Sequence, residues 1–415
     1  MSASVVIAEA SPLAAAQRTV VFSAIVVLLG GALMLGQQGW HYGALLLIGA
    51  LLGMSLYHAA FGFTSAYRSA FLHRDVTGVV AQLVMLGLAM LLFAPVLARG
   101  EAFGHGVVGA VAPASLQVAI GSFLFGLGMQ LGGGCGSGTL YTVGGGSARM
   151  VVTLIAFCAG AFAGSLDMAR YAGLPSLGAV SLAAELGFAG AVLLQLALLV
   201  ALWLGLRLWS RGTPQRPFWG AGLTQRSLLA GPWPLLFSAV MLAVLNLATL
   251  LVAGHPWTVT WAFTLWGAKA AAALGWDPLS SAFWTGGFPG AALQGSVLRD
   301  NISIMDGGII LGALLAAALA GRFSPSLRVP PLSLLAAVLG GLLMGYGARL
   351  AFGCNIGAFF SGVASFSLHG WLWIVFALLG TWVGVKLRPL FGLSNEPSGS
   401  GDRDRLRAAS HPGRR

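Results

Sequence analysis

Successive runs of about 20 apolar residues limit what this chain can fold into more than any other feature. The first three cover residues 19–35, 44–58 and 78–97. A helix needs about this length to cross the hydrocarbon core of a bilayer. The composition agrees, because 57% of the residues are hydrophobic, only 8% are charged, and the mean hydropathy is +0.87. The sequence therefore predicts an all-α polytopic membrane protein.

Further apolar runs bring the expected number of crossings to roughly ten to twelve. They cover residues 113–128, 150–166, 179–209, 233–252, 257–275, 307–320, 332–345 and 369–385. Between them lie three glycine-rich segments, 126–146, 283–298 and 345–365, that are too short to cross. Irregular backbone at membrane depth is tolerated only where it is buried in protein or lines an aqueous cavity. We therefore expect re-entrant or broken helices that mark a pathway.

An internal repeat supports this expectation. A shift of 219 residues places Gly134 on Gly353 and Cys135 on Cys354, together with four further glycine or leucine matches. A second shift, of 231 residues, places Arg68 on Arg299 and Asp75 on Asp306. Duplicated halves with interrupted hydrophobic segments are typical of transporters that bind their substrate at mid-membrane. We predict two pseudo-symmetric halves whose broken helices meet near the membrane centre.

The net charge of +11 is concentrated in two places. Arg207, Arg211, Arg216 and Arg226 lie in one hydrophilic loop, and the segment from Lys386 to Arg415 holds seven basic and three acidic residues. Basic residues that flank spans accumulate on the cytoplasmic side, so we expect the loop 207–226 and the C-terminus to be cytoplasmic. This local distribution argues against nucleic-acid binding.

These features divide the chain into five expected parts. They are an N-terminal segment (1–17) without signal-peptide character, a first membrane half (18–206), a basic cytoplasmic loop (207–231), a second membrane half (232–393) and a basic, disordered tail (394–415). The first span should be retained. The three cysteines show no metal-ligand or disulfide spacing, so we expect neither a structural metal nor a cofactor.

The motif GLGMQLGGGCGSGTLYTVGGG contains the strongest candidate site, Gly134, Cys135 and Gly136. Its partner GYGARLAFGCNIGAFFSG supplies Gly353, Cys354 and Asn355. Glycine lets main-chain N–H groups approach a ligand, and such turns bind anions. The alternative is that the glycines only allow close helix packing and the cysteines are small apolar side chains. Two cysteines in register favour the anion site, whereas Cys158 in AFCAGAFAG has no counterpart and is expected to pack.

Five cations form a second tier of pathway candidates: Arg68, Arg149, Lys269, Arg299 and Arg349. Intramembrane charges mark a pathway or pair with an opposite charge. For Arg68 and Arg299 the alternatives are extension to the headgroups or bonds to the nearby Asp75 and Asp306, and for Lys269 extension to the headgroups or a pair with Asp277. Trp257, Trp261 and Trp266 in GHPWTVTWAFTLWGAK are expected to anchor at the interface.

On the two cysteine motifs, PWTVTWAFTLWGAK, FGFTSAYRSAF and GSVLRDNISIMDGG, the chain resembles the YeeE/YedE family, the sulphur transport family that includes the bacterial thiosulfate importer. The resemblance runs from about residue 43 to 388. It implies an hourglass-shaped protein whose loops meet at the membrane centre and pass thiosulfate along cysteine thiols. Cys135 and Cys354 inherit the two central thiol roles. The importers carry a further pathway cysteine where this chain has Gly62, so the resemblance leaves the cargo less defined than the pathway.

The leading hypothesis is import of a small sulfur-containing anion, thiosulfate first, across the bacterial inner membrane. Another sulfur or selenium species is an alternative cargo, and a membrane thiol enzyme that forms a persulfide is an alternative class. The histidines form no nucleophile-and-base motif, so we expect a transporter and not an enzyme. Without an ATP-binding motif, we expect passive or ion-coupled transport, or transport pulled by a consuming enzyme. Expected partners are the anion, membrane lipid and, by the resemblance, a cytoplasmic sulfurtransferase.

Overall fold

The computed structural model describes residues 15–218, 222–325 and 328–395. Within these ranges, ten helical segments are long and apolar enough to cross a membrane. The structure thus confirms an all-α polytopic membrane protein. Most of the predicted N-terminal segment and most of the predicted disordered tail lie outside the described residues. Strands are confined to two short antiparallel pairs, β1 (Glu101–Ala102) with β2 (His105–Gly106), and β3 (Pro113–Ser115) with β4 (Ser176–Ala179).

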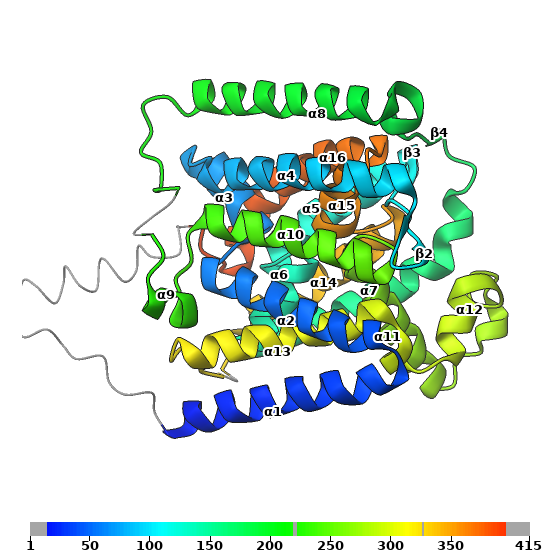
Figure 1. The fold of residues 1–415 in the computed structure, drawn as a ribbon, viewed down its shortest axis with the longest axis horizontal. Helices are drawn as coiled ribbons and strands as arrows, with labels where there is room; N and C mark the ends of the chain where they lie inside the picture. The colour runs from blue at the N-terminus through cyan, green and yellow to red at the C-terminus, as the bar shows by residue number, and fades with distance from the viewer. Residues whose placement is uncertain (1–14, 219–221, 326–327, 396–415) are drawn as a thin grey trace, which may run out of the picture.

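The helices of the first part are α1 (Ala15–Gln38), α2 (Trp40–Ala59), α3 (Phe63–His73), α4 (Thr77–Arg99), α5 (Leu116–Gly132), α6 (Gly136–Gly144) and α7 (Ala148–Tyr171). Those of the second part are α8 (Leu182–Trp209), α9 (Gln225–Ala230), α10 (Leu235–Ala253), α11 (Thr260–Ala273), α12 (Gly287–Gln294), α13 (Asn301–Leu319), α14 (Pro331–Leu350), α15 (Ser361–Ala364) and α16 (Leu368–Leu387). The long helices run roughly parallel across Figure 1, with α1 and α8 on opposite outer faces of the bundle.

Helix contacts repeat between the two parts. α5 packs against α14 at the centre, α7 packs on α14 as α16 packs on α5, and α2 packs on α13 as α10 packs on α4. The outer helices follow the same rule, since α1 contacts α13 and α8 contacts α4. Among the described residues, these contacts pair five spans of the first part with five spans of the second. This grouping assigns α8 to the second half, whereas the predicted boundary placed residues 182–206 in the first.

The repeat also changes the second predicted register. Arg74 and Asp75 lie just before Val76, the N-cap of α4, and Arg299 and Asp300 lie at the start of α13, whose N-cap is Asp300. Asp75 accepts a hydrogen bond from the Thr77 N–H, and Asp300 accepts one from the Ser303 N–H, so each carboxylate bonds to the first turn of the following helix. An Arg–Asp pair therefore precedes both helices at a shift of 225 residues. Asp306, which the shift of 231 had matched to Asp75, lies inside α13.

Close backbone contacts hold the halves together. A Cβ atom on Gly126 would overlap the carbonyl group of Ala377 in α16, and one on Gly312 would overlap the carbonyl of Ala50 in α2. Small residues at such positions let membrane helices approach closely and gain dispersion energy, because lipid provides no hydrophobic drive for helix association. The predicted role of glycine in helix packing therefore applies to these interfaces.

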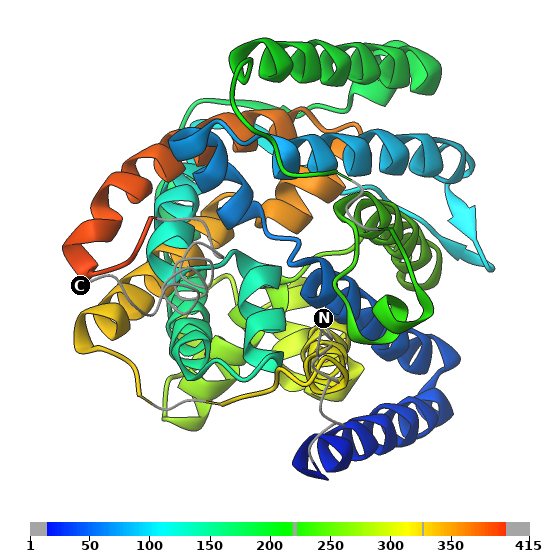
Figure 2. The same cartoon turned by 90° about the vertical axis from the view of Figure 1, so that its left-hand side faces the viewer.

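Four interrupted helices point toward the interior. Two were expected from the cysteine motifs, between α5 and α6 and after α14, and two more separate α2 from α3 and α10 from α11. Figure 2 shows the bundle turned by 90°, with α1 (dark blue) and α8 (bright green) again on opposite outer faces. The third predicted re-entrant segment, 283–298, was wrong: it forms α12 at the edge of the bundle, with mostly exposed residues (Figure 1). The predicted span 257–275 was also wrong, because its helix α11 has only 14 residues.

Candidate functional site

Cys135 lies at the break between α5 and α6. Gly133 takes a left-handed conformation (φ 91°), which reverses the chain, and Cys135 becomes the residue before the first turn of α6. Its carbonyl accepts hydrogen bonds from the N–H and the hydroxyl of Thr139, both at 2.8 Å. The thiol lies 3.5 Å from the Ser137 hydroxyl and is 2% exposed. The break therefore holds a thiol at the N-terminus of a buried half-helix, where partial positive charge gathers.

Cys354 has the equivalent position after α14. Phe352 (φ 55°) and Gly353 (φ 147°) break the helix, and a π-helical turn, Asn355–Phe360, follows the cysteine. The Ile356 N–H points at the Cys354 sulfur at 3.4 Å, and the side chain is fully buried. π-Helical turns are rare and occur frequently at functional sites. Both cysteines thus cap interrupted helices inside the protein, as the repeat had indicated.

The two cysteine loops meet. A Cβ atom built on Gly136 would lie 3.2 Å from the Cys354 Sγ, and 3.5 Å from side-chain carbons of Val259 and Thr260 at the start of α11. This contact explains the asymmetry between Gly136 and Asn355, which follow equivalent cysteines. A side chain at position 136 would press on the Cys354 thiol. Because glycine has no side chain, the Cys354 thiol keeps the space between the two loops.

Several buried polar groups beside the thiols lack a hydrogen-bond partner in the described residues. They are the Tyr67 hydroxyl, both amide atoms of Asn355 and the indole N–H of Trp257. Tyr67 is a neighbour of Asn355 and Cys135, but its hydroxyl does not reach hydrogen-bond geometry with either. Buried polar groups are almost always paired in folded proteins. Unpaired donors gathered near two thiols are therefore suited to a polar ligand.

The backbone of Trp257 is firmly fixed despite its position in a loop. Its N–H donates to the side-chain carbonyl of Asn246 at 2.7 Å, and its carbonyl accepts from the Ser361 hydroxyl at 2.6 Å. The Asn246 amide in turn donates to Ser361. These bonds link α10, the 254–259 loop and α15. The predicted interfacial anchor Trp257 is instead a fully buried residue just before α11.

An outer cavity of about 540 Å³ leads toward Cys354 from the end of the bundle where α1 meets α2. Its lining includes Trp257, Thr258, Arg299, Asp300 and Gly357. Gly357 contacts the Thr258 hydroxyl so closely that a Cβ atom there would lie 2.6 Å from it. His255 also lines this cavity, and burial lowers the pKa of its imidazole, although the Pro256 carbonyl and the Asp300 carboxylate oppose the shift. The imidazole is therefore neutral at neutral pH.

A narrow cleft of about 30 Å³ approaches from the opposite end, beside the break between α2 and α3. Gly62, Ser65, Gln82 and Arg216 are among its lining residues. A Cβ atom on Gly62 would lie 3.5 Å from the Tyr141 hydroxyl, which belongs to α6, the helix that Cys135 caps. The cleft therefore reaches the neighbourhood of the first cysteine loop.

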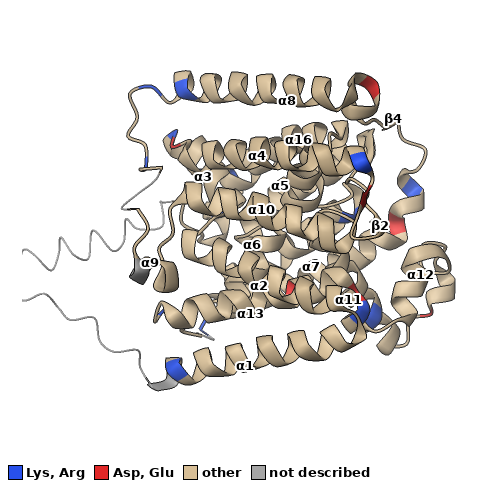
Figure 3. Cartoon of the chain, viewed as in Figure 1, with Lys and Arg blue, Asp and Glu red and all other residues tan. Residues whose placement is uncertain are grey.

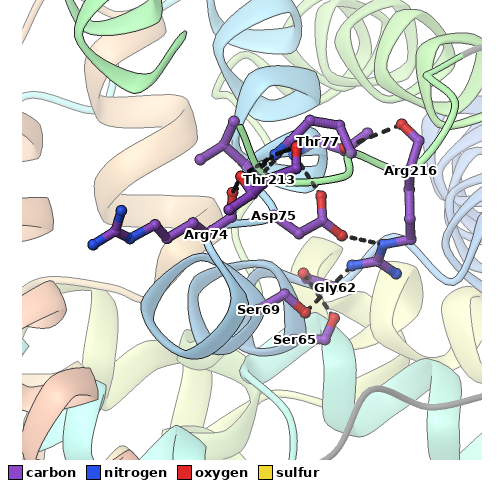
Figure 4. A network of polar contacts seen from close by, with 10 residues as sticks. Gly62, Ser65, Ser69, Arg74, Asp75, Thr77, Thr213 and Arg216 are labelled. Carbon is purple, nitrogen blue, oxygen red and sulfur yellow. Dashed lines mark hydrogen bonds and ion pairs between the residues drawn. The ribbon is translucent and has the colours of Figure 1, made fainter. Parts of the chain in front are cut away.

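An ion pair holds the basic loop over this cleft. Arg216 donates to the Asp75 carboxylate and to the Ser69 hydroxyl (3.3 Å), as Figure 4 shows. Partial burial alone would raise the pKa of Asp75. Hydrogen bonds from Thr77 and Arg216, together with the charge of Arg216, outweigh burial and lower the pKa below its usual value. The partner of Asp75 is thus Arg216, not Arg68.

Two of the five predicted pathway cations serve as helix caps. Arg149 donates to the carbonyls of Leu131 (2.7 Å) and Gly132 (2.6 Å) at the end of α5, and to Ser333. Lys269 donates to the carbonyls of Leu293 and Gly295 at the end of α12, each at 2.7 Å, and not to Asp277. Free carbonyls at helix ends attract cations. These contacts show that both side chains stabilise helix ends.

The other three cations have fewer partners. Arg299 borders the outer cavity and meets the side chain of Gln38 at 3.5 Å. Arg349 lies 5.0 Å above the ring of Phe283, and its Nε has no partner in the described residues. Arg68 on α3 is half-buried, near Arg388. Of the five, only Arg299 lines the outer cavity, and a direct role in binding remains a prediction for all of them.

The structure adds Tyr67, Tyr141 and Trp257 to the residues near the thiols, and none of them was singled out as a ligand-binding candidate from the sequence. A signal was present, since Gly62 and Pro256 interrupt apolar runs just before α3 and α11. Cys158 on α7 packs against α11, where its carbonyl contacts Gly267. Among the described residues, no group of three histidine, cysteine or acidic side chains is placed to hold a metal ion.

Comparisons with known proteins agree with this architecture. Residues 58–383 match the family described as Sulphur transport. A relative from Spirochaeta thermophila, named thiosulfate transporter TsuA, is 30% identical over 81% of this chain and 96% of its own length. The Escherichia coli thiosulfate transporter TsuA is 25% identical over 83% of this chain and 94% of its own length. A probable transporter, YedE of Escherichia coli, is 34% identical over 34% of each chain.

The family match covers most of the chain, including both cysteine loops and both added helix breaks. The relatives are named as transporters and not as enzymes. Together with the ten apolar helices, these findings identify the chain as a multi-pass membrane protein. This chain belongs to the sulphur transport family.

Proposed function

We propose that the protein imports a small sulfur-containing anion, thiosulfate first, across the bacterial inner membrane. The observation that carries the proposal is the meeting of two thiol-bearing helix breaks, with Gly136 against the Cys354 sulfur. An anion between them finds S–H donors from Cys135 and Cys354, and N–H groups at the start of two interrupted helices. The names of the two TsuA relatives favour thiosulfate.

The pathway runs from the outer cavity, past Cys354 and then Cys135, to the cleft at Gly62. Trp257, Asn355 and Tyr67 provide donors along it, because their polar atoms are buried without partners. Gly134, Gly136 and Gly353 keep the backbone open to the ligand. A thiol suits the terminal sulfur of thiosulfate, whereas the N–H groups suit its oxygens. The anion thus exchanges one set of donors for the next without crossing bare hydrocarbon.

Charge distribution supports an orientation for this transport. Helix α8 begins with Glu185 in its first turn and has Arg207 in its last, followed by Arg211 and Arg216. Figure 3 shows the same contrast at the two ends of α8. Basic residues favour the cytoplasmic side. The loop with Arg216, and with it the cleft at Gly62 and the C-terminus, is therefore cytoplasmic in our proposal, and the outer cavity is periplasmic.

Gly62 bears on the choice of cargo. Related importers have a cysteine there by the family resemblance, whereas this pathway has the hydroxyls of Ser65 and Tyr141 near that point. Two thiols with hydroxyls at the exit favour an anion that needs fewer sulfur contacts, so other sulfur or selenium anions compete with thiosulfate as cargo. A cytoplasmic sulfurtransferase that consumes the product is the partner that fits this proposal.

Competition in vesicles tests the proposed cargo. Uptake of ³⁵S-labelled thiosulfate is measured in vesicles that contain the wild-type protein, with excess unlabelled thiosulfate, selenite or sulfate outside. We expect thiosulfate to suppress the signal fully and sulfate, which lacks a terminal sulfur, to suppress it least. Equal suppression by sulfate and thiosulfate would show that the thiols do not select the cargo.

A further inference from the structure

Asp306 is a fully buried carboxyl group inside a membrane span. It lies in the second turn of α13, is 0% exposed, and neither of its oxygens has a hydrogen-bond partner in the described residues. α13 cannot shift to bring a partner to these oxygens, because backbone atoms of Met305 and Ile309 are in close contact with Gly49 and Gly53 of α2. Ionisable groups in this setting are costly and usually functional.

No cation compensates Asp306 within the described ranges. The titratable groups that interact with it are Cys158 on α7, Cys354 after α14, and Asp300 at the start of α13. The other described helices that pack on α13 provide no counter-ion beside Asp306. α2 presents Gly49 and Gly53 at this level, and its His41, Tyr42, Tyr57 and His58 lie near its two ends. α1 has Arg18 in its first turn, α6 has Tyr141, the short helix Val297–Arg299 has Arg299 beside Gln38, and Lys269 of α11 is bound to the carbonyls of Leu293 and Gly295. A buried charge without a partner is unfavourable, so the carboxyl group holds its proton in this conformation.

A polar stripe connects Asp306 with the outer cavity. Asp300, Ser303 and Asp306 follow one another at intervals of three residues and share a face of α13. Asp300 lines the cavity and accepts hydrogen bonds from the N–H (2.8 Å) and hydroxyl (2.6 Å) of Ser303. Two indoles hold this pair: Trp261 donates to Asp300 at 3.1 Å and Trp266 donates to Ser303 at 3.0 Å. The Ser303 hydroxyl thus lies one helical turn from each carboxyl group, bonded to Asp300 and not to Asp306 in this structure.

We propose that Asp306 is a proton-binding site that couples proton entry to the passage of the anion, with Asp300 and Ser303 as the route from the outer cavity. This inference rests on the proposed function. Water in the cavity supplies the proton, which ends on an Asp306 oxygen, and no other reactant is needed. Because Asp306 interacts with Cys354, an anion bound at that thiol favours the neutral acid over the carboxylate. By linkage, the neutral acid equally favours the anion.

Proton coupling lowers the electrical work of importing an anion. A dianion that enters a cell works against an inside-negative potential, and an accompanying proton reduces the charge that is moved. After the anion has passed Cys135, the repulsion at Cys354 is gone, and Asp306 releases its proton to water in a second conformation that opens toward the cleft at Gly62. The carboxyl group therefore senses occupancy of the Cys354 site without contacting the anion.

Proteoliposomes with a pH gradient test this. Thiosulfate uptake and the internal pH, reported by trapped pyranine, are recorded with and without an outside that is one unit more acidic. We expect wild-type initial uptake to rise by roughly 3- to 10-fold with the gradient, because the proton activity rises tenfold, and uptake to acidify the lumen. Asp306→Asn should show equal rates with and without the gradient and no acidification. Asp277→Asn, an exposed carboxyl at a loop, is the matched control and should behave like the wild type.

Each result has one meaning. Asp306→Asn that still responds to the gradient and still acidifies the lumen overturns the inference, as does wild-type uptake that ignores the gradient. If Asp306→Asn does not fold, Ser303→Ala is the test variant, because it leaves α13 intact and removes only the hydroxyl group from the proposed proton route. It should reduce lumen acidification per thiosulfate, and an unchanged ratio overturns the route and the coupling together. Absence of any wild-type uptake contradicts the proposed function itself.

Discussion

The Cβ position of Gly136 lies 3.2 Å from the sulfur of Cys354, although 218 residues separate the two in the chain. This contact joins the break between α5 and α6 to the break that follows α14. Any side chain at position 136 enters the space of the Cys354 thiol. The relationship therefore links the size of one residue in the first half to the freedom of a thiol in the second.

Gly136→Ala should narrow this point without unfolding the protein. The added methyl group is within a few tenths of an ångström of an ordinary contact, so the Cys354 thiol gives way and loses its position. We expect uptake to fall by at least about fivefold while thermal stability stays close to wild type. Gly205→Ala in α8, where nothing lies within 4 Å, is the matched control. Wild-type uptake by Gly136→Ala would show that the two loops do not form the constriction.

Gly62→Cys should strengthen thiosulfate transport by adding a third thiol. The backbone of Gly62 is extended (φ −125°), so a side chain causes no strain. The new Cβ would approach the Ser65 hydroxyl at 2.7 Å, a contact that rotation of Ser65 relieves. We expect several-fold higher uptake of thiosulfate, since a charge-assisted hydrogen bond contributes about 1.5–3 kcal/mol. Gly62→Ala adds the Cβ atom without the thiol and should not increase uptake, and equal gains in both variants would contradict a thiol effect.

The Asp75–Arg216 pair should make the basic loop sensitive to acid. The pKa of Asp75 is lowered in the folded protein. The ion pair therefore stabilises the docked loop fully above the unfolded pKa of about 3.8, and this stabilisation is lost as the pH falls through the folded pKa. We expect limited proteolysis of residues 211–218 to be slow from pH 7 to pH 5 and to accelerate below pH 4. An acid-active protease such as pepsin covers the low range. Asp75→Asn should be cut faster already at pH 7, by a modest factor because Arg216 is half exposed. Identical cleavage rates for the wild type and Asp75→Asn at pH 7 would show that the Asp75–Arg216 pair does not hold the loop.

Arg149→Ala should reduce stability and not only transport. Its guanidinium donates to two carbonyls at the end of α5 and to the side chain of Ser333, and removal leaves the buried Leu131 carbonyl without this donor and the Gly132 carbonyl with only the long bond from Thr153. We expect a loss of about 2–4 kcal/mol, measured by thermal denaturation in detergent. Arg149→Lys should restore the stability only in part, because one ammonium group cannot reproduce the planar set of donors of a guanidinium. Arg170→Ala, which removes a 75% exposed side chain, is the control, and equal melting temperatures for both alanine variants would refute the capping role.

The membrane class and the cysteine loops could be predicted from sequence because their signals are local. Apolar runs of span length and a Gly–Cys pair that breaks a helix need no knowledge of distant contacts. Segment 283–298 misled the prediction for the same reason. Its glycines and apolar residues resemble those of a re-entrant loop, but only long-range packing decides that α12 lies at the edge of the bundle.

Residues that depend on distant partners were assigned less well. Arg149 and Lys269 are intramembrane or interfacial cations in sequence, and only the fold shows that they cap α5 and α12. Asp306 was matched to Asp75 because six residues separate an arginine from an aspartate in both segments. The helix boundaries instead place Asp75 just before the N-cap of α4 and leave Asp306 buried within α13. The buried, unpaired polar groups of Tyr67 and Trp257 were not predicted because aromatic residues in apolar runs usually pack or anchor.

Initial uptake of ³⁵S-thiosulfate into vesicles that contain the wild type, Cys135→Ser, Cys354→Ser or Cys158→Ser tests the central claim most directly. Serine keeps the size of each side chain but removes the soft S–H donor. We predict that the first two serine variants lose at least about 90% of uptake, as expected for the loss of 1.4 kcal/mol or more at a required step, while Cys158→Ser retains wild-type uptake. Equal uptake by all four proteins would contradict a pathway through the two thiols.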